Sequence, residues 1–176
     1  MRKNNMQICI AGWYYCKEFL EFFTDSKNVY IVAHRPGNSL NIPCVIIENV
    51  GLEFNCYDYF VKNVWDKKSD VLFCHDDIKI KDISFLYELE QINAKITMVW
   101  SSEVQRRKNL AHGRMFKCSC EYLSGKKGFW WDQNNRGSLS ASKGCNNGII
   151  NLYHSSKKIL NHFFTDKIDI GKRGKV

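Results

Sequence analysis

This chain of 176 residues has little of several features that mark non-globular proteins. It contains only two prolines and shows neither a low-complexity tract nor an internal repeat, so it gives no sign of a linker or repeat architecture. No apolar run approaches the length of a membrane-spanning helix. Residues 6–15 are too short and too aromatic to form a signal peptide. We therefore expect a cytoplasmic protein with a single domain over residues 1–166.

The sequence also lacks the cysteine spacing of a zinc site. Cys118 and Cys120 are too close together for a zinc knuckle, and no second cysteine pair accompanies them. Four of the eight cysteines lie among apolar residues, as small buried thiols do: Cys9, Cys44, Cys56 and Cys74. Their placement favours reduced thiols over a disulfide framework.

Basic residues outnumber acidic residues in this chain, which gives a formal net charge of +8. This excess favours an anionic partner, which is a nucleic acid, a phosphorylated small molecule or an acidic membrane surface. A nucleic-acid-binding module is the less favoured class, because the aromatics have core spacing and no recognition motif appears. We therefore expect no nucleic acid partner. The basic tail 167–176 is interpreted as a disordered, solvated end that offers a peripheral contact with acidic membrane.

Alternating apolar segments predict an α/β fold with a mostly parallel central sheet. Short apolar runs predict five strands at residues 6–11, 28–33, 44–47, 71–74 and 94–100. Apolar residues at helical spacing predict helices at 19–24, 57–64 and 83–89. Strands that alternate with helices at this spacing are typical of right-handed crossovers between parallel strands. Beyond Trp100 we predict a strand at Met115–Cys118, a long loop at 125–148 and a closing helix at 149–164.

The segment 70–80 is the most informative stretch of the chain. Its apolar strand ends abruptly at His75, Asp76 and Asp77. Adjacent carboxylates at the end of a buried strand repel each other, and a divalent cation would relieve that repulsion. The segment therefore indicates either a Mg²⁺ or Mn²⁺ site at the carboxyl edge of the sheet, or a turn and helix cap.

The order of four short motifs resembles that of the GT-A-fold glycosyltransferases. A Glu48-Asn-Val-Gly51 turn and a helix lead to Asp70-Val-Leu-Phe-Cys-His-Asp-Asp-Ile78, which is similar to the strand that carries the family's metal-binding Asp-x-Asp motif. Ala111-His-Gly-Arg-Met-Phe-Lys-Cys-Ser119 and Gly128-Phe-Trp-Trp-Asp132 resemble the later segments near the donor sugar and acceptor. The resemblance covers most of residues 6–132, with His75 where the family has its first Asp.

The resemblance implies a three-layer GT-A-like fold and a metal-assisted glycosyltransferase of polysaccharide biosynthesis. Its partners would be a nucleotide-diphosphate sugar donor and a saccharide or lipid-linked acceptor. It implies Mn²⁺ or Mg²⁺ held by Asp77, with His75 and His154 as further ligands. A hydrogen bond to the nucleotide is the alternative role of His75. His154 has a structural role as its alternative. It also implies donor contacts from Ala11, Gly12, His34, Arg35, Asn49, Gly51, Asp76, Gly113 and Arg114.

Acidic residues are scarce where the acceptor is expected. Between Glu103 and Asp166 the chain has only Glu121 and Asp132. Asp132 follows two tryptophans, whose rings suit sugar C–H faces, and we predict that it is the general base. Its alternative role is to cap a loop. A catalytically inactive GT-A-like scaffold remains the competing function.

Overall fold

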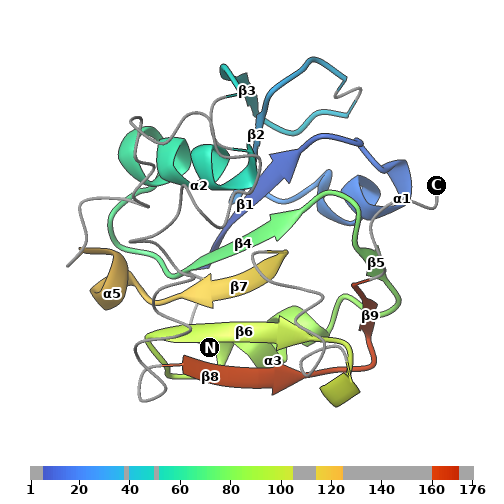
Figure 1. Ribbon diagram of the computed structural model, residues 1–176, viewed down its shortest axis with the longest axis vertical. Helices are drawn as coiled ribbons and strands as arrows, with labels where there is room; N and C mark the ends of the chain where they lie inside the picture. Colours follow the sequence, from blue (N-terminus) through green and yellow to red (C-terminus); the bar gives the residue numbers. More distant parts are fainter. Residues whose placement is uncertain (1–5, 38–39, 50–51, 105–113, 125–159, 171–176) are drawn as a thin grey trace.

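A seven-stranded sheet forms the centre of the protein, as the computed structural model shows for residues 6–37, 40–49, 52–104, 114–124 and 160–170 (Figure 1). The strand order is β3-β2-β1-β4-β7-β6-β8. In chain order the strands are β1 Gln7–Gly12, β2 Val29–Ala33, β3 Cys44–Ile46, β4 Val71–His75, β6 Ile96–Trp100, β7 Met115–Cys118 and β8 Leu160–Phe164. The first five strands predicted from the sequence are all present, within one to two residues of their expected ends.

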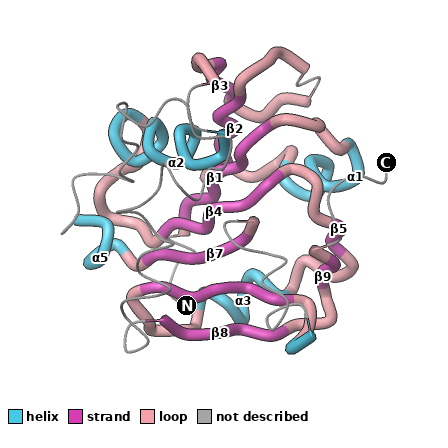
Figure 2. Tube along the Cα trace, viewed as in Figure 1, coloured by secondary structure: helices cyan, strands magenta, loops and turns pink. Residues whose placement is uncertain are grey.

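The sheet is mostly parallel, which confirms the predicted α/β class. The pairs β1–β2, β1–β4, β2–β3 and β6–β8 are parallel, and the arrows of Figure 1 show this direction for β1–β4 and β6–β8. Figure 2 marks the same strands in magenta. Strand β7 is antiparallel to both of its neighbours, β4 and β6. Because β7 runs in the opposite direction, its first residues lie beside the carboxyl end of β4.

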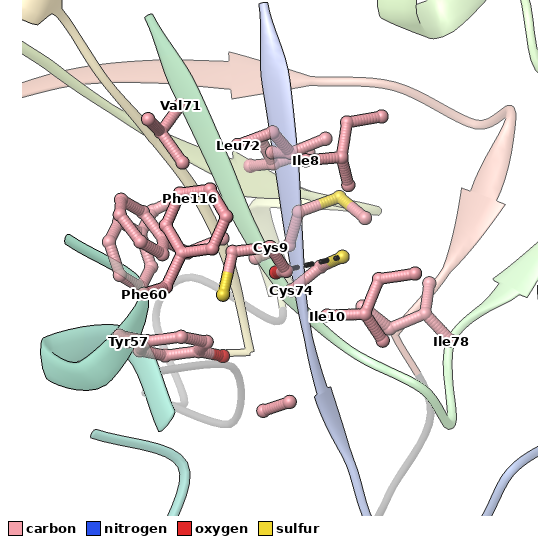
Figure 3. Close-up of a cluster of buried hydrophobic side chains, with 14 of the residues drawn as sticks. Ile8, Cys9, Ile10, Tyr57, Phe60, Val71, Leu72, Cys74, Ile78 and Phe116 are labelled. Atoms are coloured by element: carbon pink, nitrogen blue, oxygen red, sulfur yellow. Dashed lines mark hydrogen bonds between the residues drawn. The ribbon is translucent and has the colours of Figure 1, made fainter. Parts of the chain in front are cut away.

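Helices cover both faces of the sheet. In β7, Phe116 and Lys117 are successive residues and so point to opposite faces. The Phe116 ring lies 5.5 Å from that of Tyr57 on α2, Leu52–Asn63, so α2 covers one face (Figure 3). The buried Lys117 donates to the carbonyls of Leu89 and Ile92, at 3.1 and 2.8 Å, at the end of α3, Phe85–Glu90. Helix α3 therefore covers the other face, where the lysine charge suits a helix C-terminus.

The central strands are buried on both faces, and the cysteines there are free. Every residue of β1, β4 and β6 is buried. Cys74 Sγ lies 3.8 Å from the Cys9 carbonyl in the neighbouring strand (Figure 3). The seven cysteines of the described residues are free, and the eighth, Cys145, lies outside those residues.

The C-terminal region differs from the sequence-based prediction. Residues 160–164 were expected to end a helix, but they form β8 in parallel register with β6. The tail was expected to be disordered from residue 167, but residues 167–170 belong to the fold. Strand β9, Ile168–Asp169, pairs with β5, Lys79–Ile80, and both Ile168 and Ile170 are buried.

Two further helices are short. The predicted helix at 19–24 is α1, Lys17–Leu20, followed by a 3-10 turn η1, Glu21–Phe23, and α5 spans Cys120–Ser124. Among the residues that the structure describes, no helix has the length and apolar character needed to cross a bilayer.

Candidate functional site

A small cavity lies where β1, β2 and β4 end and α2 begins. Its volume is about 150 Å³. The cavity is lined by Ala11, Gly12, Trp13, Tyr14, His34, Glu53, Cys56, His75 and Asp76. The carboxyl ends of parallel strands are where open α/β sheets bind ligands, so this is the expected place for a site.

Asp76 forms hydrogen bonds with the backbone of the segment that follows β1. Its Oδ2 accepts hydrogen bonds from the backbone amides of Trp13 and Tyr15, at 2.8 and 2.5 Å. Burial raises the pKa of Asp76, although these amide bonds oppose the shift. The side chain is thus directed at the protein's own backbone, and it holds the aromatic segment 13–15 against the end of β4.

The segment 13–15 is also joined to the loop after β2. The Tyr15 hydroxyl donates to the Arg35 carbonyl, and Arg35 Nε donates to the Trp13 carbonyl at 2.6 Å. The Arg35 guanidinium lies 4.9 Å from the centre of the Trp13 ring. A Cβ atom at Gly37 would lie 2.6 Å from the Tyr15 ring, so that position requires glycine. These contacts fix the mouth of the cavity and place a cation beside it.

Four charged or polar side chains form a buried network next to the cavity. His75 lies between two carboxylates, with Nε2 3.6 Å from Glu53 Oε1 and Nδ1 3.7 Å from Asp77 Oδ1. Asp77 Oδ2 accepts a hydrogen bond from the guanidinium of Arg114. The His75 amide donates to the Arg114 carbonyl at 2.9 Å, because β7 begins beside the end of β4. The antiparallel strand therefore supplies the cation that pairs with Asp77.

A divalent cation at this point would have two of the expected ligands close together. Asp77 Oδ1 is buried and has no hydrogen-bond partner in the structure, and His75 Nδ1 lies 3.7 Å from it. An oxygen and an imidazole nitrogen are ligands that Mn²⁺ accepts. Within the described ranges, however, no three His, Cys, Asp or Glu side chains are grouped as a metal site. The residues fit a metal only if further ligands join them.

The structure brings together part of the set predicted from the sequence. Six of the predicted residues line the cavity or hold its mouth: Ala11, Gly12, His34, Arg35, His75 and Asp76. Asp77 and Arg114 form the adjacent ion pair. Asn49 is exposed and does not line the cavity. The remaining candidates lie outside the described residues: Gly51, Gly113, Asp132 and His154.

Sequence reasoning did not select four residues of the cavity wall. Trp13 and Tyr14 follow the first strand directly, and an aromatic pair just after a strand was the available signal. Glu53 and Cys56 are three residues apart on α2 and so share one face of the helix. Burial raises the pKa of the Cys56 thiol well above its usual range, so it lines the cavity as a neutral group.

No protein-family model matches this chain, and no curated protein matches it significantly. Several solved structures, however, have a similar fold. The glycosyltransferase GlyE of Streptococcus pneumoniae TIGR4 has a TM-score of 0.52 and 9% identity, over 91% of this chain and 45% of GlyE. A putative glucose-1-phosphate thymidylyltransferase of Bacillus anthracis has a TM-score of 0.55 and 10% identity, over 91% of this chain and 87% of its own. The galactosyltransferase LgtC, solved with donor and acceptor sugar analogues, has a TM-score of 0.51 and 11% identity, over 89% and 73%.

These likenesses concern the fold. The chain has the GT-A-like α/β fold expected from its motifs, with a seven-stranded, mostly parallel sheet. The chain spans about 45% of the length of GlyE. Fold alone does not define an activity, which depends on the chemistry of the site.

Proposed function

We propose that this protein binds a nucleotide-diphosphate sugar and transfers the sugar to a hydroxyl of a saccharide or lipid-linked acceptor. The observation that carries the proposal is the juxtaposition of the cavity with the network of His75, Asp77 and Arg114 at the carboxyl edge of a GT-A-like sheet. The neighbours named as sugar transferases or as a sugar-nucleotide enzyme support the same class at the level of fold.

The cavity would receive the nucleoside end of the donor. Trp13 and Tyr14 are about half exposed, at 40% and 47%, and present aromatic surface at its mouth. Arg35 lies on the Trp13 ring and adds a positive charge there. A basic chain with a net charge of +8 attracts an anionic donor of this kind.

The diphosphate would lie beside Asp77. In our proposal Asp77 and His75 hold Mn²⁺ or Mg²⁺, with His154 as a further ligand from outside the described residues. A divalent cation in this position would act as a Lewis acid on the leaving diphosphate. Arg114 is paired with Asp77 in the protein without ligand, and its guanidinium is suited to bidentate contact with phosphate oxygens.

The roles proposed for the acceptor-binding part of the site are inferred from the sequence alone. Asp132 is our proposed general base, which would take the proton from the attacking hydroxyl. Asn49, Gly51 and Gly113 remain proposed donor contacts. A peripheral contact between acidic membrane and the basic residues that follow residue 170 also remains a proposal.

One observation favours a second function, that of a binding scaffold without turnover. Asp77, the residue expected to bind metal, already has a cationic partner in Arg114. If that pair persists when donor binds, the site would hold a nucleotide sugar without activating it. Turnover in the presence of acceptor and Mn²⁺ distinguishes the two functions.

Calorimetry with nucleotide sugars, each with and without Mn²⁺, tests the proposal. In the wild-type protein we expect donor binding that Mn²⁺ strengthens. The same result is expected for the control Asp82→Asn, because Asp82 is exposed, lies beside Lys167 and does not line the cavity. We expect Asp77→Asn to lose the Mn²⁺-dependent part. If no nucleotide or nucleotide sugar binds, the proposed function is wrong. If Asp77→Asn binds donor with unchanged Mn²⁺ dependence, the metal lies elsewhere.

A further inference from the structure

Glu53 is the acidic side chain of the buried network to which the proposed function gives no role. We propose that Glu53 is a positioning residue for His75: its carboxylate accepts the hydrogen of Nε2 and leaves Nδ1 as the ring nitrogen for a cation at Asp77. This inference rests on the proposed function of the same site. His75 Nε2 is buried without a hydrogen-bond partner, and Glu53 Oε1 lies 3.6 Å from it. That distance is slightly longer than a hydrogen bond, and such contacts often tighten only when the ligand binds.

The packing of α2 on the sheet directs Glu53 at His75. Phe73 and His75 are two residues apart in β4, so both side chains point to the face that α2 covers. Tyr57 packs on Phe73, with ring centroids 5.1 Å apart, and Glu53 lies one helical turn before Tyr57 on the same side of α2. The side chains of Glu53 and His75 are each only 10% exposed. The contact between them is therefore part of the packing of helix against sheet.

The two carboxylates of the network lie beside different nitrogens of the imidazole ring. Glu53 is beside Nε2, whereas Asp77 Oδ1 is 3.7 Å from Nδ1. The ring therefore separates Glu53 from a cation held by Nδ1 and Asp77, so Glu53 would act through His75 and not as a ligand. Arg114 partly neutralises Asp77, which favours the ring hydrogen at Nε2, next to Glu53. A carboxylate that accepts from a ligand histidine fixes the orientation of its ring and the position of its hydrogen.

Two substitutions separate this role from ordinary stabilisation of α2. A glutamate in the first turn also suits the positive end of the helix dipole, but that effect requires its charge and not His75. Glu53→Gln loses the charge and keeps an oxygen that can accept from Nε2, whereas Glu53→Leu loses both. We expect binding of Mn²⁺ alone, measured by electron paramagnetic resonance, to weaken about 10–100-fold in Glu53→Leu. The loss in Glu53→Gln should be at least about fivefold smaller.

A matched control and a measurement without metal complete the experiment. Glu121→Leu is the control, because Glu121 is also a first-turn glutamate, on α5, and its side chain is 82% exposed. Its Mn²⁺ binding should not change. Nitrogen-15 NMR of the neutral imidazoles reports which ring nitrogen carries the hydrogen, and His75→Gln identifies the signal of His75. We expect the hydrogen at Nε2 in the wild-type protein and a shift toward Nδ1 in Glu53→Leu.

Several outcomes would overturn the inference. A His75 hydrogen at Nδ1 in the wild-type protein does so even if no Glu53 variant folds. Equal Mn²⁺ affinities of the wild-type protein and Glu53→Leu, equal losses in Glu53→Leu and Glu53→Gln, or absence of Mn²⁺ binding to the wild-type protein also do so. In each case, nucleotide-sugar binding by the wild-type protein leaves the proposed function intact. If the wild-type protein binds neither Mn²⁺ nor any nucleotide sugar, both are wrong.

Discussion

The Arg114–Asp77 pair gives a sharp prediction about the energetics of the site. Both side chains are buried, with exposed fractions of 5% and 11%, so water screens their charges little. Removing one member of a buried pair leaves the other charge without its main partner and typically costs about 3–5 kcal/mol. We expect Arg114→Met to lower the free energy of unfolding by about this amount. Asp77→Asn should cost less, about 1–3 kcal/mol, because the carboxamide oxygen can still accept a hydrogen bond from the Arg114 guanidinium.

Urea unfolding of the two single variants and of the double variant measures the coupling directly. We expect the double variant to be more stable than the sum of the single effects implies, by about 0.5–3 kcal/mol. Lys17→Met is the control, since Lys17 forms an exposed pair with Glu21, and exposed pairs contribute less than about 1 kcal/mol. A cost for Arg114→Met no larger than that of the control would refute the reasoning.

The same variants connect stability to ligand binding. A cation that binds the native protein and not the unfolded chain raises the unfolding midpoint. If Mn²⁺ binds at Asp77, it replaces the guanidinium charge in Arg114→Met, so its stabilising effect should be larger there than in the wild-type protein. An identical Mn²⁺ effect in Arg114→Met and in Arg114→Met/Asp77→Asn would place the metal away from Asp77.

Three further predictions follow from individual residues. Asp132→Asn should lower turnover by about 10²–10⁴-fold with little change in donor affinity, and steady-state kinetics showing normal turnover would exclude it as the base. Gly12→Ala should destabilise the protein by about 1–3 kcal/mol in urea unfolding, because the new Cβ would lie 2.8 Å from Ile31 Cγ2; unchanged stability would show that the strands can separate there. Burial alone would raise the pKa of Asp66. Hydrogen bonds from Ser69 and from a neighbouring amide lower the pKa by more than burial raises it, so the net shift is downward. The ionised Asp66 carboxylate therefore stabilises the native protein at higher pH, and this stabilisation is lost as the pH falls below about 4. In urea unfolding, the loss of stability caused by Asp66→Asn should be largest near about pH 6 and should shrink on acidification. A loss of stability that does not change with pH would contradict this assignment.

The first hundred residues could be predicted from local pattern because their strands are continuous apolar runs. Burial on both faces requires such runs, and the turn residues between them mark the ends. The segment 160–164 could not be predicted in this way. Its apolar residues fit a helical period, but pairing with β6 decides its conformation, and such tertiary pairing outweighs local preference in short strands.

The candidate site, too, could be predicted from the sequence only in part. The position of Asp76 and Asp77 at the end of a buried strand followed from the sequence, and β4 ends there. Their partners did not follow, because they come from distant segments: Asp76 binds the amide of Trp13, 63 residues away, and Asp77 binds Arg114, 37 residues away. Without these contacts, the carboxylates looked available for donor and metal alone.

The place of β7 has a consequence for how the protein is made. On the ribosome, β1 to β4 emerge first and can pair with one another, since each of them has its partner among the others. The far side of β4 stays unpaired until β7, which emerges some forty residues later and even after β6. At about 5–20 residues per second, the nascent chain exposes the unpaired edge of the largely apolar strand β4 for several seconds. We therefore expect synthesis rate and chaperone supply to affect the yield of this protein.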